Sequence, residues 1–216
     1  MMGEQRRETE EGTKVKAAAL RLSKSLIKGD NTSDPKEVDG LQSRITGDQL
    51  ISAGSTAGGE PLPLTKLDEV IDAADGATHL VMSEAMRRRL TQASRNTGAG
   101  IGGFMTFEQD GFGRKQNFYQ DIPILEVGKD ELNAEILGFN EAAVSGGSTA
   151  TSIYTLSIGP DGVSGIQNGG IDVRDLGEID SKPVMRTRVE WLVGMAIFRG
   201  TAAARLQHIA DAEVVK

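Results

Sequence analysis

One feature of this chain limits its possible folds more than any other: a long run near the C-terminal end in which apolar and charged residues alternate. Uncharged, mostly apolar side chains occupy every second position, namely Met185, Thr187, Val189, Trp191, Val193, Met195 and Ile197. The residues between the first of them are charged, namely Arg186, Arg188 and Glu190. A spacing of two is typical of a β-strand with one buried face and one face open to solvent or to a partner.

If residues 184–198 are extended throughout, they span roughly 50 Å at about 3.3 Å per residue, which exceeds the usual length of a strand. A strand of this length predicts an elongated domain. The alternative is an ordinary strand that bends at Gly194, where the missing side chain permits a bulge. Under either interpretation the run has mainly a structural role.

Composition bounds the class of protein. A chain of 216 residues with 38% hydrophobic and 25% charged residues can bury a core in one domain or in two small ones. It has no cysteine, which excludes disulfides and thiolate metal sites and fits folding in a reducing cytoplasm. No apolar run reaches the length needed to span a bilayer, and the N-terminus is charged where a signal peptide is apolar. The net charge of -7 disfavours direct recognition of nucleic acid.

A helix is expected over residues 13–28. One face carries the apolar side chains Val15, Ala19, Leu22 and Leu26, and another carries Lys14, Arg21 and Lys28. Acidic residues lie near its positive end, and Gly29 can close it in the left-handed conformation.

The middle of the chain alternates between helical and extended patterns. A helix beginning at a capping Thr65 buries Leu67, Val70, Ile71 and Ala74, and a second helix, capped by Ser83, buries Met86, Leu90 and Ala93. Short strands are expected at residues 78–82, 116–119 and 122–127. This alternation predicts a compact mixed α/β subdomain.

Several local patterns could indicate chemistry, but each has a better structural explanation. Gly98, Gly100 and Gly103 have the spacing of a dinucleotide-binding turn, yet a helix precedes them where a strand is required. His79 and His208 have no spaced metal-ligand partner. We therefore expect no enzymatic activity, no cofactor and no metal site.

Two charged clusters leave alternatives open. Arg87, Arg88 and Arg89 form a solvated helix face, or else they face packaged nucleic acid or acids of a neighbouring subunit. The acidic residues Asp172, Asp175, Glu178 and Asp180 do not follow a calcium-binding loop, and Arg174 and Lys182 among them favour salt bridges.

Four segments carry a resemblance to a known family. Val38, Asp39, Gly40 and Leu41 follow the helix in the manner of a Phe-Asp-Gly-Leu element, with Val in the aromatic place. Gly113, Arg114, Tyr119, Ile122, Pro123 and Ile124 match a turn that leads to an Ile-Pro-Ile/Val strand, and Ser152, Ile153 and Tyr154 match the strand that follows. The most specific block contains Gly165, Gln167, Asn168, Gly169, Gly170, Asp175, Leu176, Gly177, Arg186, Arg188, Glu190 and Trp191. In this order, the segments resemble tailed-bacteriophage major capsid proteins of the Hong Kong 97-like fold.

The resemblance implies an α+β fold with a long spine helix, elongated peripheral-domain strands and a compact mixed α/β axial domain. It places the spine helix and the start of the peripheral domain in residues 1–60, the axial domain in residues 61–178, and the return to the peripheral domain with a C-terminal segment in residues 179–216. In the family, an N-terminal arm and an extension loop precede the spine helix. Here the helix begins almost at Met1, so we expect both to be absent and autonomous closure of shells to be impaired.

The implied function is that of a phage or prophage head protein, present in the virion and assembled in the host bacterial cytoplasm. Its subunits would form pentamers and hexamers of an icosahedral shell around double-stranded DNA, with scaffold, protease and portal proteins as further partners. The alternatives are an encapsulin-like bacterial compartment shell and, more remotely, a small nucleotide-binding α/β enzyme.

Candidate subunit-contact residues are the mixed charges of the C-terminal third: Arg174, Asp175, Arg186, Arg188 and Glu190. Residues 128–150 are rich in small side chains, and we expect them to include the loop that reaches the capsomer axis.

Overall fold

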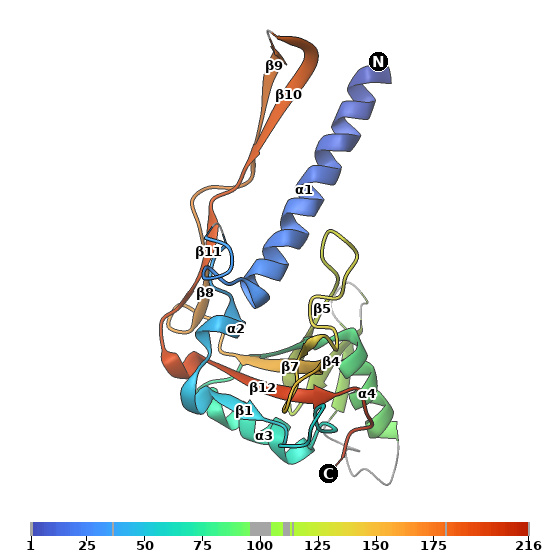
Figure 1. Cartoon of the computed structure of the whole chain (residues 1–216), viewed down its shortest axis with the longest axis vertical. Helices are drawn as coiled ribbons and strands as arrows, with labels where there is room; N and C mark the ends of the chain where they lie inside the picture. Colours follow the sequence, from blue (N-terminus) through green and yellow to red (C-terminus); the bar gives the residue numbers. More distant parts are fainter. Residues whose placement is uncertain are drawn as a thin grey trace.

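The computed structural model of the chain describes residues 2–35, 37–95, 105–109, 113, 115–179 and 181–215. Figure 1 shows two parts: a compact part built around a sheet, and an elongated part in which one long helix and a two-stranded ribbon project away from it. The expected α+β class, with a long helix, elongated strands and a compact mixed subdomain, is confirmed.

The compact part is organised by one mixed sheet. Its strands, in spatial order, are β1 (Leu50–Ser52), β12 (Ala203–Ala210), β7 (Ser148–Leu156), β2 (His79–Ser83), β5 (Ile122–Val127), β4 (Lys115–Tyr119) and β3 (Met105–Gln109). The short strand β6 (Glu141–Ala142) pairs with β7. The pairs β1–β12 and β2–β5 are parallel, whereas the other pairs are antiparallel.

One side of the sheet packs against α3 (Leu64–Ala73) and α4 (Glu84–Arg95), as the apolar stripes predict. The predicted stripe residues of both helices are buried in one cluster with alternate strand residues such as Leu80 and Met82. Ser83 caps α4 as expected, because its hydroxyl accepts a hydrogen bond from the Met86 backbone N–H (3.2 Å). The capping role expected of Thr65 is wrong: the helix begins one residue earlier, with Pro63 at the cap position.

The other side of the sheet is also buried. It contacts the C-terminal end of α1, the short helix α2 (Leu41–Arg44) and the loop after β5. Val81 and Tyr154 point to this side, whereas their strand neighbours Leu80 and Ile153 belong to the first cluster. Because both faces are covered, the central strands are almost continuously buried.

Helix α1 (Met2–Lys28) is longer than predicted, since it begins well before Thr13. It does not close through a left-handed glycine. Instead, the Gly29 backbone N–H bonds to the Ser25 carbonyl (2.9 Å), and Gly40 donates its N–H to the Gly29 carbonyl (2.8 Å). A Cβ at Gly40 would lie 2.7 Å from the Ile27 carbonyl group, so glycine is required there for close contact of two backbones.

The ribbon has an inner pair of strands, β8 (Val163–Gln167) with β11 (Val193–Ile197), and an outer pair, β9 (Asp172–Ile179) with β10 (Lys182–Glu190). The expected single strand over residues 184–198 is therefore wrong. Trp191 and Leu192 interrupt it, whereas Gly194 lies in regular register opposite Ile166. The apolar stripe continues across the interruption because both halves contact the same helix.

After the ribbon, the short 3-10 turn η2 (Gly200–Ala202) leads the chain back into the sheet; a similar turn, η1 (Gly47–Gln49), precedes β1. The last strand, β12, lies between β1 and β7, inside the compact part. The resemblance places residues 179–216 in the peripheral domain and a C-terminal segment, and this division stays a prediction. The small residues Ala203 and Ala204 of β12, next to Leu206 and Ile209, are fully buried, which suits a central strand.

Candidate subunit-contact surface

The outer ribbon presents two chemically different faces. Residues directly opposite each other in antiparallel strands share a face, and the face alternates along the strand. Arg188 pairs with Arg174 and Glu190 with Asp172, whereas Thr187 pairs with Asp175. The register therefore separates a strongly charged face from a second face that carries Thr187 and Val189.

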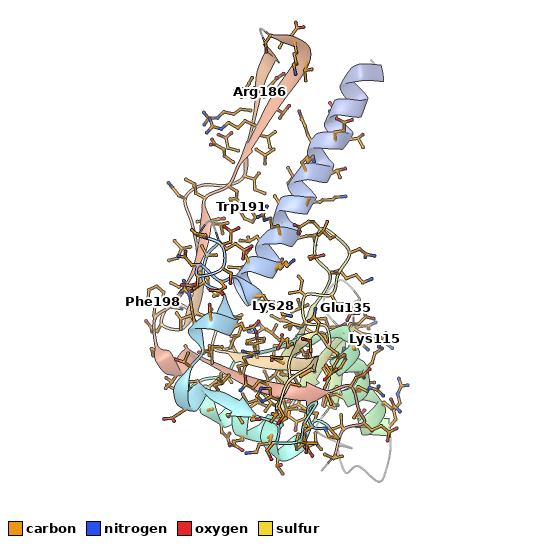
Figure 2. The ribbon with its side chains drawn as sticks, viewed as in Figure 1. Lys28, Lys115, Glu135, Arg186, Trp191 and Phe198 are labelled. Carbon is orange, nitrogen blue, oxygen red and sulfur yellow. The ribbon has the colours of Figure 1, made fainter. Side chains whose placement is uncertain are left out.

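The second face is turned towards α1. The Thr187 hydroxyl donates a hydrogen bond to the Glu11 carboxylate (2.8 Å), and Val189 lines a groove with Ala18 and Leu22 of the helix. The charged face consequently points away from the helix. Figure 2 shows the ribbon side chains projecting on both sides, with Arg186 near the outer end and Trp191 close to α1.

Four of the five predicted contact residues lie on the charged face. Arg174 forms an ion pair with Asp172 (2.5 Å), and Arg188 forms one with Glu190. The hydrogen bond to Asp172, with a smaller contribution from the charge of Glu190, raises the pKa of the Arg174 guanidinium. Strand alternation adds Arg186 to the same face. The face thus alternates in sign over a short distance, as expected of a surface that fixes the register of a partner.

Asp175, the fifth predicted residue, lies on the other face of the ribbon, and its predicted contact role stays a prediction. It lies on the helix-facing side of β9, and its carboxylate accepts a hydrogen bond from the Gly177 N–H (2.8 Å). Gly177 has a φ of 74° at a shift of the strand register between Met185 and Thr187. Asp175 therefore supports a β-bulge, which increases the local twist of the ribbon.

Exposed apolar side chains concentrate on the ribbon and its two ends. They are Ile166, Val173, Leu176, Val184, Met185, Leu192 and Phe198, of which Leu192 is 66% exposed. Two strands and one helix cannot enclose so many apolar groups. Exposed apolar side chains gathered on one projecting segment, with charged residues between them, are typical of a protein-interaction surface.

A buried polar network connects the long helix to the sheet, and no local sequence pattern predicts it. The Glu141 carboxylate of β6 forms an ion pair with Arg205 of β12 (3.0 Å) and accepts a hydrogen bond from the Ser152 hydroxyl of β7 (2.5 Å). Lys28, at the end of α1, lies 3.2 Å from the other carboxylate oxygen. Arg205 also stacks over the ring of Tyr154, 5.7 Å from its centroid, and burial raises the pKa of that phenol.

Comparison with known proteins gives structural matches alone. No protein-family model and no curated protein sequence matches the chain. An encapsulin from Synechococcus elongatus PCC 7942, in its holo-SrpI complex, superposes with a TM-score of 0.64 at 18% identity over 100% of this chain and 68% of that one. The capsid of the native GTA particle superposes with a TM-score of 0.58 at 15% identity, and that of the empty GTA particle with 0.57 at 13%. Both GTA matches cover 94% of this chain and 66% of the other.

The chain has the Hong Kong 97-like capsid-protein fold. In this fold α1 is the spine helix, the ribbon supplies the elongated peripheral strands, and the sheet with α3 and α4 forms the axial domain. Both kinds of solved neighbour come from capsid or encapsulin assemblies. This chain spans about two thirds of the length of each neighbour.

The arginine triplet and the two histidines noted in the sequence contact groups of the same chain. The three consecutive arginines of α4 pair with acids of the same chain: Arg87 with Glu126, Arg88 with Glu84 and Arg89 with Asp211. His208, in a left-handed conformation at an irregularity of β12, contacts the Ser52 hydroxyl (3.0 Å). His79 contacts the Thr78 hydroxyl (2.9 Å), and partial burial lowers the pKa of each imidazole.

Three further findings bear on function. Gly98, Gly100 and Gly103 lie outside the described residues. Within the described ranges, no group of three or more acidic or histidine side chains is placed to hold a metal ion. In the same ranges, no helix is both long enough and apolar enough to cross a membrane.

Proposed function

We propose that this chain is the major capsid protein of a tailed bacteriophage or prophage. In this proposal its copies associate into pentamers and hexamers of an icosahedral shell that encloses double-stranded DNA. The shell is assembled in the host bacterial cytoplasm with the help of scaffold, protease and portal proteins, and the mature location is the virion. The role is structural, without turnover.

The observation that carries the proposal is the ribbon. Its apolar side chains, among them Met185 and Leu192, lie far from both cores of the compact part, and its outward face carries ordered charge pairs. A two-stranded ribbon is at best marginally stable alone, so this surface gains most by association. Heterologous contacts between identical chains build rings, and many weak contacts acting together make ring closure cooperative.

The experiment that tests the proposal is light scattering on the gel-filtered protein, with negative-stain images of every peak. Rings with five or six members, or closed shells, are the expected result. A protein that stays monomeric at high concentration, with its fold intact by circular dichroism, would contradict self-association as the function of this chain.

The charged face allows a sharper test of the predicted contact residues. Arg188→Glu should reduce the yield of rings or shells, because it places a third acid beside Glu190 and Asp172 on a surface proposed to bind its partner through complementary charges. Arg88→Glu on α4 is the matched control, since Arg88 is equally exposed but lies on the axial domain. Unchanged ring yield and morphology in Arg188→Glu would remove this face from the interface.

An encapsulin-like compartment shell is the second candidate, favoured by the TM-score of 0.64 against 0.58 and 0.57 for the GTA capsids. The content of particles isolated from the native host separates the two. Nuclease-protected double-stranded DNA supports the phage head, whereas a copurifying protein cargo without DNA supports the compartment shell.

A further inference from the structure

The loop after β5 displays a single leucine in an unusual way. Leu132 is 79% exposed, the highest value among the exposed large apolar side chains of the described residues. It lies at the tip of a small hairpin that a bridge between Lys129 and Glu135 closes. The acidic residues Glu131 and Glu135 of this loop are exposed beside it.

The hairpin is rigidly built although its tip touches nothing. The Asp130 carboxylate accepts hydrogen bonds from the backbone N–H groups of Leu132 (3.0 Å) and Ala134 (2.9 Å). Its second oxygen binds the Lys24 ammonium group of α1 at 2.9 Å. Most of the conformational entropy of the tip is therefore lost on folding, so a partner that buries Leu132 pays little to order it.

A groove on another face of α1, between the helix and the ribbon, is chemically complementary to this hairpin. Its apolar lining comes from Ala18, Leu22, Val38, Val189, Trp191 and Val193. Arg21 also lines it, exposed and without an ion pair in the described part of the chain, and Glu37 lies at the same groove.

The two features cannot meet within one subunit. The groove residues and Lys24, which holds the hairpin, lie on α1 faces roughly 110° apart at 3.6 residues per turn. Figure 2 places Trp191 between the ribbon and the helix, and Glu135 on the other side of the C-terminal end of the helix. One subunit thus carries the hairpin on one flank and the groove on the other, which is the arrangement required for head-to-tail contacts.

We propose that Leu132 of one copy of this chain inserts into the groove between α1 and the ribbon of a neighbouring copy. Glu131 then faces Arg21 of the neighbour. This inference rests on the proposed self-association and names one contact that drives it.

Cysteine trapping tests the contact directly, because the chain contains no cysteine of its own. Leu132→Cys subunits are mixed with Ala18→Cys subunits under mild oxidation, and covalent dimers are followed on non-reducing gels. The control mixture pairs Leu132→Cys with Ser55→Cys, an exposed position of the compact part. We expect linkage at least about tenfold faster in the first mixture, because the docked pair has a high effective concentration. Equal rates in the two mixtures overturn the proposal.

The direction of the contact is tested with the double variant Leu132→Cys/Ala18→Cys. Head-to-tail contacts give a ladder of covalent oligomers, whereas products that stop at the dimer would contradict them. Rapid linkage of Leu132→Cys with itself would also contradict the proposal. Shells that form without any linkage between positions 132 and 18 sink this inference and leave the proposed function intact.

Substitutions on both sides of the proposed contact give an independent test, in which the strength of association between subunits is measured. Leu132→Ser should weaken association about tenfold or more through loss of one buried leucine, whereas Ile158→Ser, at an exposed apolar position elsewhere, should not. Glu131→Arg and Arg21→Glu should each weaken association, and together they should restore it. Sedimentation velocity measures the association of all five variants, and failure of the double variant to recover excludes the predicted charge pair.

Discussion

The axial domain buries its apolar side chains, whereas the ribbon leaves many of its apolar side chains exposed. In the axial domain the sheet is covered on both faces, and residues such as Leu90, Ile153 and Leu206 are fully buried. On the ribbon, Leu192 is more than half exposed, and Val189 and Trp191 are covered on one side alone, by α1. The chain therefore buries its core in one region and leaves the other exposed, where the proposed function places contacts between subunits. Mutations should separate accordingly into effects on stability and effects on assembly.

The buried network offers the largest contrast. Arg205→Met leaves the buried Glu141 carboxylate with Lys28 as its only cation, so we expect the free energy of unfolding to fall by about 3–5 kcal/mol. Arg188→Met removes an exposed pair on the ribbon and should change it by less than about 0.5 kcal/mol. Urea denaturation of both variants provides the measurement. Equal losses would show that the ribbon contributes to the folding core.

A pair of leucines tests the same contrast without charge. Leu90→Ala on α4 should cost about 2–5 kcal/mol of unfolding free energy, because it empties a fully buried site. Leu192→Ala should leave the unfolding free energy almost unchanged and reduce the yield of assembled particles. Thermal unfolding and light scattering on the two proteins measure both quantities. A stability loss for Leu192→Ala as large as that for Leu90→Ala would end the distinction between the regions.

Two glycines probe how closely backbone segments approach in each region. Gly40→Ala places a Cβ 2.7 Å from the Ile27 carbonyl group at the base of the spine helix, and we expect a loss of about 1–3 kcal/mol in unfolding free energy. Gly165→Ala in the inner ribbon meets no atom within 4 Å and should be tolerated. Chemical denaturation distinguishes them. If Gly40→Ala is as stable as the parent, the close approach of α1 to residue 40 is not a constraint.

Acid should weaken the attachment of α1 to the hairpin. Hydrogen bonds from Lys24, and then from the backbone of Ala134 and Leu132, lower the pKa of the Asp130 carboxyl. A carboxyl whose folded-state pKa lies below its unfolded value stabilises the fold above that value, about 3.9, and loses this contribution as pH falls through the folded pKa. Asp130→Asn should therefore lose less stability than the parent between pH 7 and about pH 3.

The measurement is the urea midpoint at both pH values. Asp72→Asn, at an exposed position of α3, provides the control and should follow the parent. Parallel pH profiles for the parent and Asp130→Asn would show that this carboxylate does not hold the hairpin to the helix.

Local pattern predicted the axial domain well, and the reasons are physical. The stripes of α3 and α4 and the cap at Ser83 depend on residues within a few positions of each other, so periodicity alone reveals them. Contacts between residues far apart in the sequence could not be predicted from local patterns. Glu141 and Arg205 are 64 positions apart, and nothing near either residue indicates that they meet in a buried network. The cap at Thr65 failed because the preceding proline begins the helix.

The ribbon was predicted in kind and missed in detail. The alternation from Met185 correctly predicted an elongated strand with two different faces, but it could not show that Trp191 and Leu192 leave the strand between two separate ladders. Asp175 carried the same charge pattern as its neighbours, and the bulge at Gly177 gave it a role within the chain. The hairpin of Leu132 was missed because its rigidity depends on Lys24, over a hundred residues away.

The attachment of α1 also has a mechanical consequence. At 1.5 Å per residue its 27 residues form a rod about 40 Å long, and its ion pairs with the axial domain lie at one end, at Lys24 and Lys28. Because the helix is held at its C-terminal end, a tilt of about 10° there moves its N-terminal end by roughly 7 Å. The hydrogen bond between Glu11 and Thr187 takes the ribbon along. A few buried atoms near Lys28 thereby set the angle between the helix and the sheet, and in the proposed shell this angle would determine the curvature of the wall.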